Sequence, residues 1–94
     1  MKHRENTQDV FEQLGFDPSE AANLRLRAAM MNAVIAEIER QRLTQAKAAK
    51  TLGVSQPRIS DLMKGKLHLF SLDMLVTLLA GLGLRVEMKV RRAA

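Results

Sequence analysis

The sequence of 94 residues contains no cysteine, tryptophan or tyrosine, and these absences exclude several kinds of protein. Without cysteine the chain forms no disulfide bond, offers no thiolate to a metal ion and has no thiol nucleophile. Aromatic residues make up only 3%, so Leu, Ile, Val, Met and Ala have to build the core, which suits packed helices. The sequence also lacks a run of about 18 apolar residues and an apolar stretch near its N-terminus. We therefore expect no membrane span, no signal peptide and a cytoplasmic location.

A chain of this length fits one small domain, for which a second subunit could matter for stability. Its positive charge is unevenly distributed. Residues 1–42 carry six Lys or Arg and seven Asp or Glu, whereas residues 43–94 carry nine and three. A basic half favours an anionic partner, most often a nucleic acid, although an ordinary solvated surface would explain the charge alone equally well.

The first strong helix signal begins at Asp17, a plausible N-cap that is followed by Pro18 and then by Glu20. Apolar residues then recur on one helical face as far as about Arg42. They are Leu24, Ala28, Met31, Ile35 and Ile38. A second stripe of Leu26, Met30 and Ala33 packs on the same core in the simpler interpretation, and meets a partner chain in the other.

Hydroxyl residues that can cap a helix start and glycines suited to a helix end delimit three further helices. The hydroxyl residues are Thr44, Ser55 and Ser71, and the glycines are Gly53, Gly65 and Gly83. The predicted fold is therefore mainly α, a four-helix bundle in residues 18–83. Residues 1–17 form a polar extension, and residues 84–94 form a C-terminal strand and basic tail.

The strand is predicted from strict alternation of apolar and charged residues over residues 84–91. Its apolar members are Leu84, Val86, Met88 and Val90. Because one strand cannot satisfy its own backbone groups, it needs a mate. The mate is residues 10–16, the same strand of a second copy, or the sheet edge of another protein. We favour pairing across a dimer, with these four residues in the interface.

Residues 44–65 have the spacing of a helix-turn-helix motif. Counted from Gln45, a small residue (Ala49) stands at the fifth position and a turn glycine (Gly53) at the ninth. Ile59 and Leu62 stand at the fifteenth and eighteenth positions, where they face inward. No single member of this set is diagnostic, but together they predict the motif strongly.

The start of the second helix of this motif is polar although the core does not require it. Gln can bond adenine and Arg can bond guanine through two hydrogen bonds, and a helix-turn-helix presents these positions to the major groove. The candidate base-reading residues are Ser55, Gln56, Pro57, Arg58 and Ser60. We expect the side chains of Gln56 and Arg58 to project into solvent. The candidate phosphate-binding residues are Thr44, Gln45, Lys47, Lys64 and Lys66.

Catalysis and metal binding have little support in the sequence. The only histidines, His3 and His68, are far apart, and no carboxylate cluster or glycine-rich loop accompanies them. We therefore predict a protein that is not an enzyme and uses no cofactor or metal.

The stretch from Leu43 to Val90 resembles Xre-type, phage-repressor-like helix-turn-helix proteins, and more narrowly their small antitoxin members. The segments "FEQLGF", "EAANLRLRA" and "GVSQPRISDLMKGK" carry the narrower resemblance. It implies a homodimer on a palindromic operator, repression of its own operon, and neutralisation of a RelE/HigB-type ribonuclease toxin. The alternatives are a stand-alone Xre-type regulator without a toxin, and a protein-interaction module that keeps the motif only as a scaffold.

Overall fold

The structure is a computed structural model that describes residues 10–92, and it is mainly helical, as the sequence predicts. Its helices are α2 (Pro18–Arg40), α3 (Gln45–Leu52), α4 (Gln56–Met63) and α5 (Leu72–Gly81), with a 3₁₀ turn η1 (Leu67–Leu69) between the last two. Residues 10–13 are helical as well. Among the described residues, no helix is long and apolar enough to cross a membrane.

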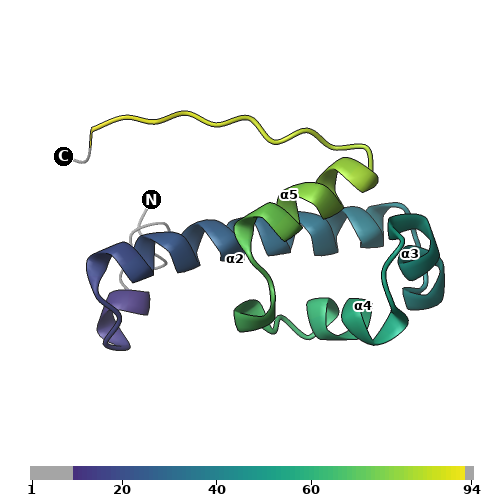
Figure 1. Ribbon diagram of the computed structural model, residues 1–94, viewed down its shortest axis with the longest axis horizontal. Helices are drawn as coiled ribbons and strands as arrows, with labels where there is room; N and C mark the ends of the chain where they lie inside the picture. The colour runs from purple at the N-terminus through teal and green to yellow at the C-terminus, as the bar shows by residue number, and fades with distance from the viewer. Residues whose placement is uncertain (1–9, 93–94) are drawn as a thin grey trace.

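The long helix α2 is the axis on which the other helices assemble (Figure 1). Helix α5 packs along α2, and α3 and α4 pack against each other near the C-terminal end of α2. The first turns of α2 extend beyond this assembly, which makes the molecule elongated, with extents of 41 × 25 × 24 Å. The helix-turn-helix therefore occupies one end of the molecule.

Every predicted helix cap is confirmed. Asp17 Oδ1 accepts a hydrogen bond from the Glu20 amide at 2.9 Å, and Pro18 is the first residue of α2. The hydroxyl of Thr44 caps α3, that of Ser55 caps α4 and that of Ser71 caps α5. These short-range contacts define where each helix starts because they satisfy amides that have no partner within the helix.

The core lies between the four helices and is almost entirely aliphatic, as the aromatic-poor composition requires. Ile38, Ile59, Leu62 and Leu75 are 2% exposed or less, and Phe70 at 1% is the single buried aromatic residue among those described. The second stripe on α2 does not form one continuous surface. Met30 is buried in the core, whereas Leu26 remains 52% exposed and Ala33 is exposed too.

The predicted strand is not present in the described residues. Residues 84–92 have no regular secondary structure and run back along the body from the end of α5 as an extended tail (Figure 1). Residues 10–16 cannot be the mate, because residues 10–13 are helical, so that alternative is wrong. A strand exists only where a second backbone pairs with it, and residues 10–92 of a single chain supply none. The four alternating apolar side chains are all exposed, up to 84% for Met88 and 81% for Val90.

A buried carboxylate joins the end of α2 to the end of α5. Glu37 is 8% exposed and receives hydrogen bonds from Arg40 Nη2 at 2.6 Å and from Gln41 Nε2 at 2.7 Å. Gln41 Nε2 also donates to the Leu82 carbonyl at 3.0 Å. The hydrogen bond from Arg40 has the larger effect and that from Gln41 the next largest, and both favour the ionised carboxylate. They lower the pKa of Glu37 from 4.5 to about 2.

Candidate DNA-binding site

Helices α3 and α4 and the turn between them form the predicted helix-turn-helix motif. Gly53 ends α3 in the left-handed conformation, at φ +69°, and the Val54 amide donates to the Ala49 carbonyl at 3.0 Å. Ala49 is 7% exposed, so a small residue does stand at the close approach of the two helices. Ile59 and Leu62 face inward with 1% and 0% exposure.

The two buried residues of α4 determine which of its side chains face outward. In an α-helix each residue turns by about 100°, so burial of Ile59 and Leu62 directs Pro57 and Lys64 to the opposite side. Pro57, Lys64 and Gln56 are indeed exposed, while Ser60 and Asp61 are partly exposed on the flanks. The first turn of α4 is thus open to a ligand at Gln56 and Pro57.

Arg58 does not project freely, contrary to the expectation from the sequence. Its guanidinium carbon lies 4.6 Å from the centroid of the Phe70 ring, and its Nη2 donates to Met74 Sδ at 3.3 Å. The side chain is therefore partly buried between α4 and α5. The reason is its position on the flank of α4, beside the inward face, where α5 and the segment before it are within reach.

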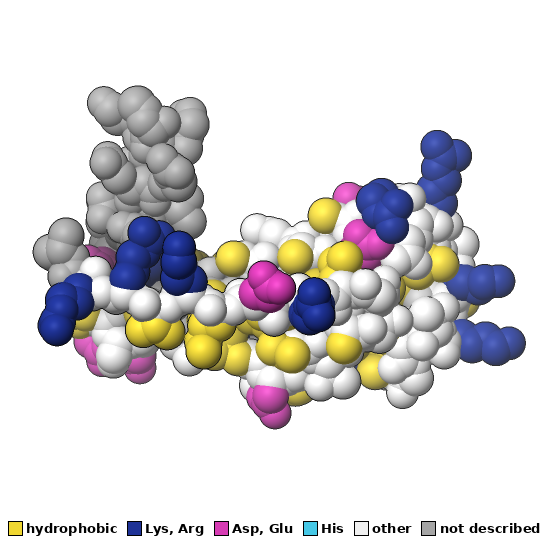
Figure 2. Space-filling view, turned by 90° about the horizontal axis from the view of Figure 1, so that it is seen from above, with side chains coloured by type: hydrophobic (Ala, Val, Ile, Leu, Met, Phe, Trp, Pro, Cys, Tyr) yellow, Lys and Arg dark blue, Asp and Glu magenta, His cyan; other side chains and the backbone are white. Residues whose placement is uncertain are grey.

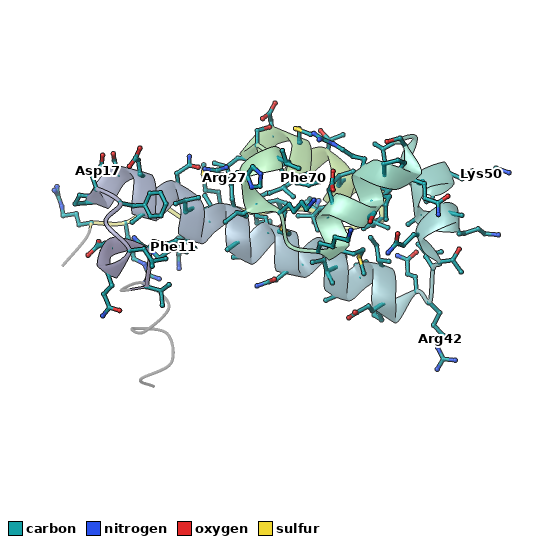
Figure 3. All side chains as sticks on the ribbon, turned by 90° about the horizontal axis from the view of Figure 1, so that it is seen from below. Phe11, Asp17, Arg27, Arg42, Lys50 and Phe70 are labelled. Carbon is teal, nitrogen blue, oxygen red and sulfur yellow. The ribbon has the colours of Figure 1, made fainter. Side chains whose placement is uncertain are left out.

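The candidate phosphate-binding residues are exposed at the motif. Thr44, Gln45 and Lys47 are exposed at the start of α3, and Lys64 is exposed at the end of α4. Lys66 is exposed as well, but its ammonium forms an ion pair with Asp61 at 3.3 Å. Lys and Arg side chains stand out from the α3 end of the molecule (Figure 2), and Lys50 and Arg42 project away from the body there (Figure 3). This end therefore presents positive charge to solvent.

The sequence did not reveal how the segment after α4 is held. Arg27 Nη1 lies 3.3 Å from the Phe70 carbonyl and 3.4 Å from that of Leu67, so it ties η1 to α2 (Figure 3). Phe70 in turn supports Arg58. The one feature of the sequence that could have indicated this contact is Phe70 itself. It is one of three phenylalanines in the chain and stands directly before the cap residue Ser71.

The structure describes one of the two histidines. His68 is exposed on η1, and His3 lies outside the described residues. Within residues 10–92 no group of three or more His, Cys, Asp or Glu side chains could hold a metal ion.

Comparison with known proteins agrees with this geometry. A family model described as a helix-turn-helix domain matches residues 10–91. The chain belongs to this helix-turn-helix family. A solved structure whose name assigns it to the XRE family of transcriptional regulators shares the fold, with a TM-score of 0.74 and 39% sequence identity over 79% of this chain and 83% of that one. No curated protein matches the chain. The family match and the structural match together identify an Xre-type helix-turn-helix protein and support a DNA-binding role in transcription regulation.

Proposed function

We propose that this Xre-type protein is a sequence-specific repressor that binds double-stranded DNA as a homodimer on a palindromic operator. The observation that carries the proposal is the open first turn of α4, where Gln56 and Pro57 are exposed above a fully formed motif. In proteins of this architecture, that turn enters the major groove and touches base edges. The exposed residues Gln45, Lys47 and Lys64 then bind phosphates on either side.

The base contacts follow from the chemistry of the outward side chains. Gln56 can bond adenine through both atoms of its amide, and Ser60 can donate or accept one hydrogen bond. The hydroxyls of Ser55 and Thr44 already accept backbone amides as helix caps, which leaves each of them a single donor for a phosphate or a base. Arg58 is the remaining candidate from the sequence, and its packing on Phe70 sets it apart from the others.

The proposed dimer joins two copies through their C-terminal tails. Leu84, Val86, Met88 and Val90 are exposed, and the first two border a hollow of about 660 Å³ beside Val76 and Ala80 of α5. Pairing of residues 84–91 with the same residues of a second copy satisfies their backbone and covers these side chains. The two α4 helices of such a dimer should lie about 34–36 Å apart to reach successive major grooves.

A truncation tests the dimer. The chain ended after Gly83 retains all four helices and should sediment as a monomer, whereas the full chain sediments as a dimer. A matched full-length control, Glu87→Gln, changes only the charged face of the tail and should remain dimeric. A truncated chain that is still dimeric would move the interface to the helices.

An electrophoretic mobility shift assay tests DNA binding. The full-length protein should retain the duplex upstream of its own gene at moderate salt and release unrelated duplexes of equal length. Gln56→Ala should weaken that complex, since the residue is exposed and its replacement leaves the core intact. Equal and feeble retention of every duplex would contradict the proposal. Affinity that is unchanged in Gln56→Ala would favour a scaffold that only binds proteins.

We also propose that the protein acts as the antitoxin of a RelE/HigB-like ribonuclease toxin. The support is its resemblance to small antitoxins and the apolar surface on the projecting part of α2. There Leu26 is exposed, and Phe16 and Leu24 line a hollow of about 580 Å³. Co-expression with the adjacent open reading frame tests this. A frame that is toxic alone and co-purifies with the full chain supports an antitoxin, and a harmless frame leaves a stand-alone regulator.

A further inference from the structure

The contact between Arg58 and α5 is a direct link from the DNA-reading helix to the rest of the bundle. The guanidinium lies over the Phe70 ring, with its carbon 4.6 Å from the ring centroid, and Nη2 meets Met74 Sδ at 3.3 Å. Phe70 is 1% exposed and is thus fixed in the core, so it offers a rigid surface for this contact. Both interactions are of recognised types, a cation–π contact and a hydrogen bond to a thioether.

Apart from the core that Ile59 and Leu62 share with α5, helix α4 approaches α5 less extensively than it approaches its other neighbours. Its extensive packing is with α3, and a smaller contact joins it to α2. On the α5 side, a hollow of about 220 Å³ separates the elements, and Arg58, Phe70 and Met74 line it. The side chain of Arg58 lines this hollow and contacts Phe70 and Met74 on its other side. It can therefore control how α4 is rotated and tilted, which decides where Gln56 points.

A guanidinium in this position is poorly placed to read a base. Gln56 and Arg58 lie on opposite flanks of α4, each about 100° round the helix from Pro57. Arg58 is on the flank that meets Phe70 and Met74. To reach a base edge it would have to leave both the Phe70 ring and the Met74 sulfur. Gln56 needs no such rearrangement, because its side chain is exposed and forms no hydrogen bond with any described residue.

We propose that Arg58 is a positioning residue: through Phe70 and Met74 it holds α4 in the orientation that lets the outward residues read DNA, and it does not itself read a base. The proposal rests on the proposed DNA-binding function and refines it. Base preference then comes from the open face of α4, with Gln56 as its main reader. Loss of Arg58 weakens binding to all sequences by a similar factor.

Selection from a pool of randomised duplexes, followed by binding measurements on single-base variants of the selected site, tests the proposal with the full-length protein. We expect Arg58→Ala to reduce affinity about tenfold for the selected site and its variants alike, with the order of preference unchanged. Gln56→Ala should instead flatten preference at one base pair. The slope of affinity against salt should stay near that of the native protein in Arg58→Ala, whereas loss of a phosphate contact would lower it by about 0.9 per contact.

The second part of the experiment replaces the two side chains that Arg58 contacts. Phe70→Leu keeps an apolar side chain in the core but removes the ring, and Met74→Leu removes the sulfur acceptor while keeping the bulk. Each should reproduce part of the loss seen in Arg58→Ala, and Arg58→Ala combined with Met74→Leu should cost little more than Arg58→Ala alone. Affinity is measured under conditions in which circular dichroism shows each variant to be fully folded. A substitution that only lowers the free energy of unfolding would then leave the DNA affinity unchanged. If Phe70→Leu does not fold, Met74→Leu carries this part of the experiment.

Two results would overturn the proposal. One is loss of preference at a single G·C pair in Arg58→Ala, with Met74→Leu behaving as the native protein, which would make Arg58 a guanine reader. The other is unchanged hydrogen exchange of the α4 amides in free Arg58→Ala, since release of the contact should speed exchange in residues 56–63 more than in α2. A native protein that selects no sequence would refute the DNA-binding function itself, and the exchange measurement would still decide whether Arg58 holds α4.

Discussion

Replacement of Lys64 by Gln should lower the salt dependence of DNA binding without changing which sequence is preferred. Lys64 is exposed at the end of α4, on the line of outward residues that starts at Pro57. Such an ammonium can neutralise one phosphate, and each neutralised phosphate contributes about 0.9 to the slope of log affinity against log salt. The proposed dimer would lose two such contacts, so the slope should fall by about 1.8.

This change is large enough to measure. Between about 50 and 200 mM salt, a slope lower by about 1.8 makes the native protein lose roughly 12 times more affinity than Lys64→Gln. Fluorescence anisotropy with a labelled duplex at four or five salt concentrations gives both slopes. The matched control is Lys89→Gln, which removes one exposed positive charge outside the helix-turn-helix motif. Its slope should equal that of the native protein. Equal slopes for Lys64→Gln and the native protein would refute the phosphate contact.

Two further predictions concern stability. Gly53→Ala should destabilise the fold by about 1–2 kcal/mol in urea denaturation, because residue 53 has a left-handed φ of +69° that an L side chain adopts only with strain. A midpoint equal to that of the native protein would contradict this. Because the folded pKa of Glu37 is about 2 instead of 4.5, its ionised form stabilises the fold above pH 4.5, and this contribution disappears as the pH falls towards 2. Urea midpoints of Glu37→Gln should therefore fall less over that range than those of the native protein, with exposed Glu39→Gln as the control.

The helix boundaries and the motif could be predicted from the sequence because they depend on residues close together in the chain. A cap such as Ser55 accepts a hydrogen bond from an amide only three residues away. The turn after α3 requires a positive φ, which glycine adopts without strain, and Gly53 supplies it. The inward positions of Ile59 and Leu62 follow from the helical period alone. Each of these features is local, so tertiary packing has little scope to override it.

The behaviour of Arg58 could not be predicted in the same way. The helical period shows that it lies on the flank of α4, between the buried and the open faces. Whether a flanking arginine projects into solvent or folds onto a neighbour depends on what lies beside that flank. Here the neighbours are Phe70 and Met74, which are 12 and 16 residues further along the chain, and their approach is fixed by the packing of α5 on α2. A contact of this kind is tertiary and leaves no periodic signal.

The tail shows a different limit. Alternation from Leu84 to Val90 predicts which side chains would share one face of a strand. A strand also needs a second backbone to pair with, and the alternation does not indicate whether one is present. The structure of one chain satisfies the first condition and not the second, so the residues are extended without being paired. The apolar side chains along this tail are up to 84% exposed, so they contribute to stability only when another surface covers them. In the proposed dimer the pattern would serve the assembled protein and not the single chain, and truncation after Gly83 tests that assembly directly.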